Sequence, residues 1–286
     1  MAAREHSLRA ADGTPLFVAD WSADAQQTAR GGIVLMHGLG EHCGRYTHVV
    51  RFFNACGWSV RTYDHRGHGR SGGAPGDVPD GEAVFRDAEL VIADFARQFD
   101  EPPLLFGHSM GGLFAARFAA GALAPLRGLI LSSPALALPL NSAQKLLLKT
   151  LGAIAPGLAV PNGVPTRYLS HDPAVIKAYD EDPLVHPKIS ARLLNCMLEA
   201  IGFAQMHASA LTIPTLLVIA GDDRIVDVSG SQTFFRQLRP GIGTIHVYPD
   251  FYHEVFNEVD ARRVFGDVHA WLAAHHWSAA TQDMQL

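Results

Sequence analysis

Residues 103–118 read PLLFGHSMGGLFAARF, and this junction is the most informative stretch of the chain. An apolar run typical of a buried strand ends at Gly107, and an apolar pattern typical of a helix begins after Ser109. Only small neighbours let the backbone turn this sharply, so Gly107 and Gly111 supply room and Gly112 lets the helix approach the strand. The pattern predicts a serine hydroxyl that projects from the sheet as a nucleophile. A serine that merely caps the helix is the alternative.

Short apolar segments alternate with helical patterns along most of the chain. The candidate strands are 14–21, 33–37, 58–64, 103–107, 126–133, 215–221 and 244–249. The candidate helices are 45–56, 82–99, 110–123, 229–238 and 259–275. Apolar strands separated by helices are typical of a parallel sheet covered on both faces. We therefore predict an α/β fold with a mostly parallel central sheet flanked by helices, and an antiparallel start because no helix separates the first two strands.

One region interrupts this alternation. Residues 134–206 contain no strand pattern, only apolar helical pieces broken by proline and glycine. The sequence thus predicts a core formed by residues 1–133 and 209–286, with an inserted helical cap at 134–208. An insertion after a sheet strand overhangs the carboxyl ends of the strands, where open α/β sheets bind ligands. We expect this cap to be a lid, although additional core helices would give a similar pattern.

Composition excludes several classes of function. The 286 residues carry a net charge of −5, with 48% hydrophobic and 18% charged residues, so no basic field predicts nucleic-acid binding. The three cysteines, Cys43, Cys56 and Cys196, form no metal-ligand spacing, and no Gly-x-Gly-x-x-Gly loop is present. We expect no metal and no cofactor. The N-terminus lacks a signal-peptide core and no apolar stretch could span a bilayer, so we expect a cytoplasmic protein.

A serine nucleophile needs a base and an acid, and candidates follow two later strands. Asp222 and Asp223 come directly after strand 215–221, and His253 follows strand 244–249. In this arrangement Ser109 attacks, His253 accepts and returns the proton, and either aspartate orients the imidazole. Spacing alone does not choose between the two aspartates, and a surface turn is the alternative for each.

The developing oxyanion needs two backbone N–H donors. Met110 lies at the helix N-terminus after the nucleophile, and Leu39 begins a glycine-flanked turn after strand 33–37. We expect their N–H groups to form the oxyanion hole. His37, at the end of the same strand, is expected to be structural.

Three motifs give the chain a family resemblance. HGLGEHCGRY (37–46), GHSMGG (107–112) and YDHRGHGRSGG (63–73) resemble patterns of the α/β-hydrolase superfamily, in particular its monoacylglycerol lipase and lysophospholipase branch. The resemblance covers nearly the whole chain. It implies that the acid is Asp223, which precedes an arginine, and that the base is His253 of a Tyr-His pair.

The same resemblance implies a glycerol-binding corner. The family's Glu and Arg of the first motif correspond to Glu41 and Arg45, and its cap tyrosine before Asp-Pro-Leu corresponds to Tyr179. Two positions depart from the animal enzymes. Phe256 replaces a second histidine, which we expect to remove a polar head-group contact and add apolar surface, and Val226 replaces a cysteine.

These residues predict a serine esterase or lipase that works through an acyl-enzyme. Long-chain monoacylglycerol or lysophospholipid is the first substrate hypothesis, and a small-ester carboxylesterase is its main rival. A proline-iminopeptidase-like peptidase is a further alternative, in which Asp180, Glu181 and Asp182 would hold an N-terminal ammonium. A binding protein on a hydrolase fold is the alternative from another class, but such proteins usually lose a member of the triad.

The cap sequence also raises the question of membrane contact. Residues 136–160 read LALPLNSAQKLLLKTLGAIAPGLAV, with two lysines among many leucines. We expect this stretch to form the inner wall of the substrate pocket. Peripheral contact with a lipid interface is compatible with that role. The pattern makes no prediction of oligomeric state.

Overall fold

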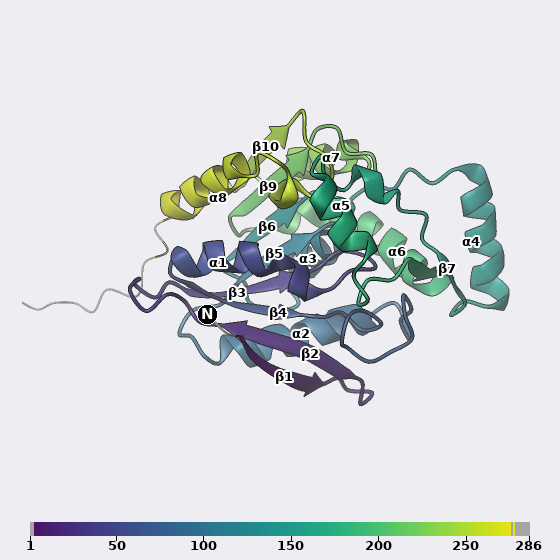
Figure 1. The fold of residues 1–286 in the computed structure, drawn as a ribbon, viewed down its shortest axis with the longest axis horizontal. Coiled ribbons are helices and arrows are strands. Elements are labelled where there is room, and N and C mark those ends of the chain that lie inside the picture. Colours follow the sequence, from purple (N-terminus) through teal and green to yellow (C-terminus); the bar gives the residue numbers. More distant parts are fainter. Residues whose placement is uncertain (1–2, 276, 278–286) are drawn as a thin grey trace, which may run out of the picture.

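The computed structural model describes residues 3–275 and 277, and it is organised around an eight-stranded sheet (Figure 1). Its strand order is β1-β2-β4-β3-β5-β6-β9-β10. The strands are β1 (Arg4–Arg9), β2 (Pro15–Trp21), β3 (Gly31–Met36), β4 (Trp58–Tyr63), β5 (Leu104–His108), β6 (Gly128–Ser132), β9 (Thr215–Ala220) and β10 (Gly243–Tyr248). Strand β2 runs antiparallel to both of its neighbours, and the other neighbouring pairs are parallel. The predicted mostly parallel sheet with an antiparallel start is confirmed.

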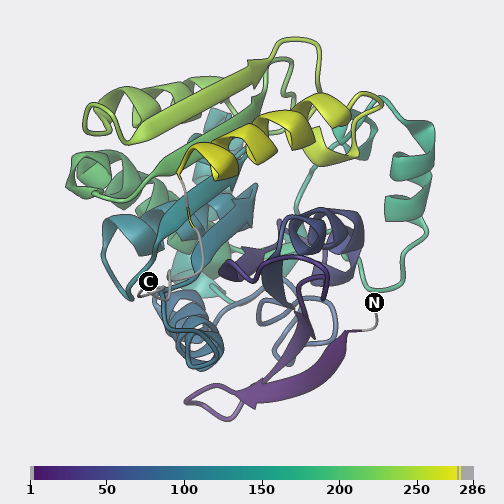
Figure 2. The same cartoon turned by 90° about the vertical axis from the view of Figure 1, so that its left-hand side faces the viewer.

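Helices cover both faces of this sheet (Figure 2). The helices are α1 (Thr47–Ala55), α2 (Ala83–Ala96), α3 (Met110–Ala120), α7 (Val228–Gln237) and α8 (Arg262–Ala274). Alternate residues of β3 point to opposite faces, as the pleat requires: Ile33 and Leu35 pack with α1 and α8, and Val34 and Met36 pack with α2 and α3. Short 3₁₀ turns are η1 (Cys43–Tyr46), η2 (Thr166–Tyr168), η3 (Ala208–Ala210) and η4 (Val255–Asn257).

The chain between β6 and β9, residues 134–208, is called here the inserted segment. It contains α4 (Ser142–Ile154), β7 (Ala159–Pro161), α5 (Pro173–Asp180), β8 (Lys188–Ser190) and α6 (Ala191–His207). Figure 1 shows α4 standing away from the sheet beside β7. Strands β7 and β8 pair antiparallel, so the expectation of no strand in this region was wrong. Three residues are too few to produce a recognisable periodic pattern.

The sequence also failed to predict β1. Its residues, REHSLR, are mostly polar and partly or fully exposed, so the strand carries little of the alternating hydrophobicity that identifies a buried strand. Pairing with β2 over the whole length of β1 satisfies its backbone instead. The strand lies at the edge of the sheet, where polar side chains protect against unwanted pairing.

Candidate active site

Ser109 occupies the turn between β5 and α3 with an unusual backbone conformation, φ 53° and ψ −118°. Residues other than glycine rarely adopt a positive φ. The glycines around it are needed for space: a Cβ on Gly107 would lie 2.4 Å from the carbonyl oxygen of Gly111, and one on Gly111 would lie 2.4 Å from that of His37. The turn therefore has the sharp geometry that the sequence predicted.

The Ser109 side chain begins a short chain of hydrogen bonds. Its Oγ donates to Nε2 of His253 at 2.8 Å, and Nδ1 of His253 donates to Oδ2 of Asp223 at 2.7 Å. The backbone N–H groups of Ile225 and Val226 hold the other oxygen of Asp223 at 2.9 and 3.0 Å. This order leaves Nε2 as the acceptor, so a neutral His253 can take the serine proton.

Asp222 is excluded from this chain of hydrogen bonds. Its carboxylate is 38% exposed and pairs with Arg224 at 2.6 Å on the surface, whereas the Asp223 side chain is 1% exposed and pairs with His253. Asp223, the aspartate that the family resemblance implied, is thus the one of the two that contacts His253.

Burial and charge act in opposite directions on the two ionisable partners. Burial raises the pKa of Asp223, but the His253 charge and hydrogen bond, together with two backbone N–H donors, hold that pKa below its ordinary value. Burial likewise lowers the pKa of His253, but the Asp223 charge and hydrogen bond, with the nearby Glu254 and Glu41, raise it above its ordinary value. The site therefore favours a carboxylate next to an imidazole that readily accepts a proton.

Leu39 and Met110, whose N–H groups are expected to form the oxyanion hole, both line the cavity next to Ser109. Within the described part of the chain, neither the N–H of Leu39 nor that of Met110 has a hydrogen-bond partner, and both residues line the same cavity as Ser109. Met110 is the first residue of α3, whose N-terminal dipole favours a negative charge. Free donors at this place can stabilise a tetrahedral intermediate.

His37 has a structural part in this loop, as expected. Its Nε2 accepts the backbone N–H of His65 at 2.9 Å, so its Nδ1 carries the proton and donates to the carbonyl of Gly38 at 2.7 Å. The ring is fully buried, and burial followed by the neighbouring histidines His65 and His68 holds its pKa well below the ordinary value. A neutral His37 thus supports the turn that begins at Leu39.

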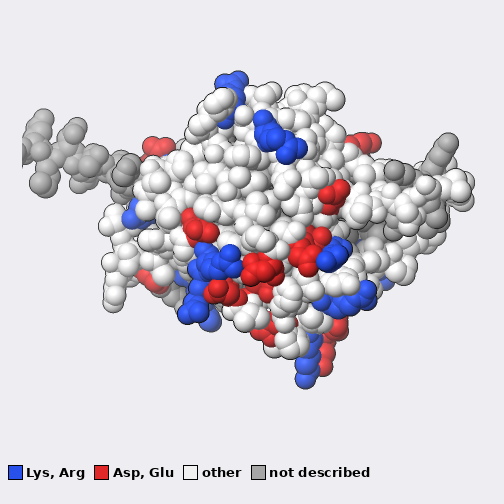
Figure 3. Space-filling view, turned by 90° about the horizontal axis from the view of Figure 1, so that it is seen from above, with Lys and Arg blue, Asp and Glu red and all other residues white. Residues whose placement is uncertain are grey.

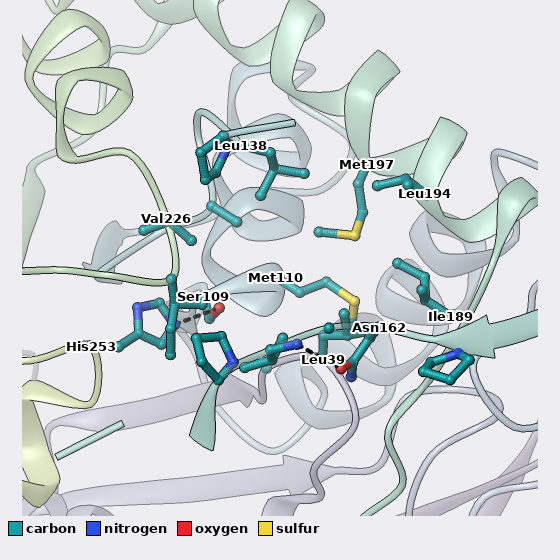
Figure 4. Close-up of a pocket in the computed structure, with 18 of the residues that line it drawn as sticks. Leu39, Ser109, Met110, Leu138, Asn162, Ile189, Leu194, Met197, Val226 and His253 are labelled. Atoms are coloured by element: carbon teal, nitrogen blue, oxygen red, sulfur yellow. Dashed lines mark hydrogen bonds between the residues drawn. The ribbon is translucent and has the colours of Figure 1, made fainter. Parts of the chain in front are cut away.

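A cavity of about 420 Å³ opens over Ser109 and His253. Figure 4 shows these two residues at one side of it, across from Ile189, Leu194 and Met197. Most of the residues that line it belong to the inserted segment, and many of these are apolar, among them Leu138, Leu148, Leu151, Ile189, Leu194 and Met197. The polar side chains Glu41, Tyr179 and Glu254 also line it. The cavity is thus suited to a molecule with a long apolar part and a small polar part.

The three residues implied as a glycerol site lie together. Nη1 of Arg45 donates to Oε2 of Glu41, and the guanidinium lies over the ring of Tyr179, 4.7 Å from its centroid. Oε1 of Glu41 also accepts the N–H of Gly38 at 2.6 Å and the hydroxyl of Tyr46 at 2.5 Å. Arg45 itself does not line the cavity, so Glu41 and Tyr179 are the members that a ligand would touch.

Sequence reasoning missed Glu254 in this corner. Its two oxygens accept Nη1 and Nη2 of Arg45 at 2.7 and 2.9 Å, and Asn257 donates to it at 2.7 Å. Burial raises the pKa of Glu254, but Arg45 lowers it to about 2. The available signal was a carboxylate directly after the candidate base, although sequence alone does not show that Arg45 is its partner.

Phe256 does not fulfil its predicted role. It is 5% exposed and packs in the core against Phe106 and Phe265, with ring centroids 5.5 and 5.2 Å away, and it does not line the cavity. The expectation that it adds apolar surface at the head group was therefore wrong, because its side chain belongs to the helix–sheet interface. Val226 does line the cavity.

The acidic residues expected of a peptidase are also outside the cavity. Asp182 pairs with Nε2 of His42 at 2.9 Å, and Glu181 lies 4.0 Å from Lys177 with a side chain that is 68% exposed. Neither they nor Asp180 line the cavity. They cannot hold an N-terminal ammonium next to Ser109 in this arrangement.

The described residues give little support for a metal site, a membrane-spanning helix or a nucleic-acid surface. Over residues 3–275 and 277, no group of three or more His, Cys, Asp or Glu side chains could hold a metal ion. No helix in that part of the chain is long and apolar enough to cross a membrane. On the face seen in Figure 3, charges of both signs are interspersed and form no extended basic patch of the kind that binds nucleic acid.

Comparisons with known proteins agree with this geometry. A family model described as serine aminopeptidase, S33 matches residues 27–260. A monoacylglycerol lipase of Mycolicibacterium smegmatis is 36% identical over 95% of this chain and 97% of its own length. The phospholipase YtpA of Bacillus subtilis is 34% identical over 86% of this chain and 95% of its own length.

Solved structures give the same result. The crystal structure of Paleococcus ferrophilus monoacylglycerol lipase superimposes with a TM-score of 0.82 at 35% identity, covering 91% of this chain and 99% of that one. The fold, the sharp turn at Ser109 and the sequence similarity over most of the chain lead to one conclusion. The chain belongs to the serine aminopeptidase S33 family of the α/β hydrolases.

Proposed function

We propose that this protein is a serine hydrolase that cleaves carboxylic esters of lipids, with monoacylglycerols or lysophospholipids as substrates. The observation that carries the proposal is the hydrogen-bonded series Ser109–His253–Asp223 at one side of a largely apolar cavity. The serine and histidine supply the chemistry, and the apolar wall offers a place for an acyl chain.

In the proposed mechanism, Oγ of Ser109 attacks the ester carbonyl while His253 takes the serine proton. The N–H groups of Leu39 and Met110 stabilise the oxyanion, and Asp223 stabilises the imidazolium. Collapse of the tetrahedral intermediate breaks the bond to the alcohol, which takes the proton from His253 and departs. The acyl group remains bound to Oγ of Ser109 as an acyl-enzyme. Water then attacks the acyl carbon and gives a proton to His253. Collapse of this second intermediate breaks the bond to Oγ of Ser109, which takes the proton back from His253, and a carboxylic acid is released.

The two parts of the cavity support the choice of substrate. Apolar side chains from the inserted segment would surround the acyl chain, whose burial supplies about 0.8 kcal/mol per methylene group. Glu41 and Tyr179, supported by Arg45, would bind the hydroxyl groups of a glycerol head. Relatives described as a monoacylglycerol lipase and a phospholipase support lipid esters as the substrate class.

The inserted segment is proposed to act as a cap over this site, within the predicted boundaries 134–208. On α4 and directly after it, Leu146, Ile154 and Leu158 are 66%, 75% and 54% exposed. Exposed apolar side chains on a projecting helix favour contact with a lipid interface, from which a monoacylglycerol would enter.

A small-ester carboxylesterase is the second candidate, because the same residues would hydrolyse any ester that fits. The measurement that separates the two is kcat/KM over monoacylglycerols of increasing chain length, lysophosphatidylcholine, and p-nitrophenyl acetate to palmitate. We expect kcat/KM to rise with chain length and to be highest for a glycerol or phosphoglycerol head group. A maximum at acetate or butyrate would replace the lipid hypothesis with the small-ester hypothesis.

Covalent labelling tests the enzyme class itself. A fluorophosphonate reacts only with an activated serine, so we expect stoichiometric labelling of the folded protein and none of Ser109→Ala. Folded protein without labelling would refute the hydrolase proposal and favour a binding protein. Labelling that persists in Ser109→Ala would assign the nucleophile to another residue.

A further inference from the structure

The loop that carries His253 is joined to the inserted segment. We call residues 249–258 the His253 loop. The backbone N–H of His253 donates to the carbonyl of Tyr168 at 3.3 Å, and that of Glu254 donates to the carbonyl of Leu169 at 2.8 Å. Oγ of Ser170 donates to the carbonyl of Asn257 at 2.8 Å. A loop of the core thus depends on residues of the inserted segment for its position.

A buried carboxylate lies at the end of this contact. The Glu258 side chain is 2% exposed, and each of its oxygens accepts two donors. Oε1 accepts the N–H of Tyr252 at 2.7 Å and Nδ1 of His171 at 2.8 Å. Oε2 accepts the N–H of His171 at 3.2 Å and the N–H of Val259 at 3.3 Å. Glu258 therefore holds the residue before His253 and the inserted segment with one group.

Ring stacking reinforces the same contact. The rings of His171 and Tyr252 are stacked, with centroids 3.7 Å apart and planes 18° from parallel. The ring of Tyr168 packs edge-on against that of Tyr252, with centroids 5.4 Å apart. Because Tyr252 precedes His253 directly, a movement of His171 or Tyr168 changes the direction from which the imidazole leaves the backbone.

We propose that Glu258 is a positioning residue for His253, acting through Tyr252, and that His171 makes the alignment of His253 depend on the position of the inserted segment. This inference rests on the proposed function, in which His253 is the general base. Glu258 itself touches neither Ser109 nor the cavity. A displacement of about 1 Å in a catalytic group can lower a rate by about a hundredfold, so this indirect contact affects kcat.

The test compares four forms of the full chain. Glu258→Gln is nearly isosteric, but its single carbonyl oxygen cannot accept all four donors, and its amide N–H₂ faces N–H groups. His171→Phe keeps a ring to stack on Tyr252 and removes only the Nδ1 donor. Asp260→Asn is the matched control, because this carboxylate is 49% exposed and lies two residues further along the chain.

Two readouts separate positioning from stability. The first is kcat and KM for p-nitrophenyl butyrate, normalised to active sites titrated with a fluorophosphonate. We expect kcat to fall about ten- to a hundredfold in Glu258→Gln, and less in His171→Phe, with KM unchanged within about twofold. Asp260→Asn is expected to match the wild type.

The second readout does not require activity. The proton between Nδ1 of His253 and Asp223 is expected to give a low-field ¹H NMR signal in the wild type and in Asp260→Asn, and to broaden or shift in Glu258→Gln. An unchanged signal and a wild-type kcat per titrated site in Glu258→Gln would overturn the positioning role. An inactive, unlabelled wild type that shows the low-field signal would instead refute the proposed function.

Discussion

Arg45 and Glu254 form a two-point ion pair, with Nη1 to Oε1 at 2.7 Å and Nη2 to Oε2 at 2.9 Å, in which both side chains are almost fully buried. The same guanidinium contacts Glu41, so two carboxylates share one cation next to the proposed base. The local charge balance is therefore negative. A negative environment stabilises an imidazolium, which makes Glu254 part of the electrostatics of His253.

The first prediction concerns pH. His253 accepts a proton only when it is neutral, so kcat/KM should fall as the pH drops through its pKa. Burial lowers this pKa, but Asp223, Glu254 and Glu41 raise it above the ordinary 6.5, so the acid limb should have its midpoint above pH 6.5. Glu254→Gln should move the midpoint to lower pH, because it removes one of the negative charges that raise this pKa. The measurement is the pH profile of kcat/KM for p-nitrophenyl butyrate.

Asp222→Asn is the control for this shift. Asp222 is adjacent to the triad aspartate in sequence, but it is more exposed and neutralised by Arg224. Solvent screens such a charge, so its removal should leave the midpoint in place. Equal shifts in the two variants would contradict a specific role of Glu254.

The second prediction concerns the turn at Ser109 between β5 and α3. Gly111→Ala places a Cβ 2.4 Å from the carbonyl oxygens of both Met36 and His37, just before the turn that begins at Leu39. Overpacking of this kind costs about 1–3 kcal/mol, and it should displace the N–H of Leu39 and lower kcat more than tenfold. Gly266→Ala is the matched control, because a Cβ there meets nothing within 4 Å.

In α8, alanine is a better helix former than glycine, so Gly266→Ala should raise the free energy of unfolding by about 0.5–1 kcal/mol without changing activity. Urea unfolding and kcat on the same preparations check both variants. Wild-type activity in Gly111→Ala would show that the loop relaxes around the additional methyl group.

The third prediction concerns the head group. Tyr179→Phe keeps the ring beside Arg45 and removes only the hydroxyl from the cavity. Loss of one hydrogen bond to a glycerol hydroxyl should raise KM for 1-monooleoylglycerol about three- to tenfold. A smaller change is expected for p-nitrophenyl butyrate, which has no glycerol. Equal effects on both substrates would argue against a glycerol site at Tyr179.

The fourth prediction concerns the lipid interface. Ile154→Glu combined with Leu158→Glu should weaken cosedimentation with phosphatidylcholine vesicles and slow hydrolysis of vesicle-borne 1-monooleoylglycerol. Neither residue lines the cavity, so hydrolysis of soluble p-nitrophenyl butyrate should continue at the wild-type rate. Met206→Glu is the control, since Met206 is 77% exposed but lies on α6. Comparable losses in this control would indicate a general effect of added charge.

Short sequence patterns predicted the buried strands and the turn at Ser109. The buried strands β3 to β6 and the turn at Ser109 follow from apolar runs and from glycines that the turn requires. The order Ser109, Asp223 and His253 could be predicted because each residue follows a strand end, and parallel strands bring such ends to one edge.

Long-range pairing of polar side chains could not be predicted in this way. Glu254 pairs with Arg45, some two hundred positions earlier in the chain, and Glu258 pairs with His171 of the inserted segment. Phe256 was misplaced for a related reason, because His253 and Glu254, a few residues earlier, line the cavity whereas the Phe256 ring packs in the core. Such choices depend on how two elements pack, which no short window of sequence contains.

The backbone conformation of Ser109 lowers the stability of the fold while it serves the proposed catalysis. At φ 53° and ψ −118°, glycine would be the more comfortable residue, and strain of this kind costs about 1–3 kcal/mol. Selection for stability alone would therefore favour glycine at position 109. We expect glycine there in homologues that no longer hydrolyse a substrate. A homologue with glycine at this position would be more stable but would lack the nucleophile. Serine at this position thus trades stability for the nucleophile that the proposed function requires.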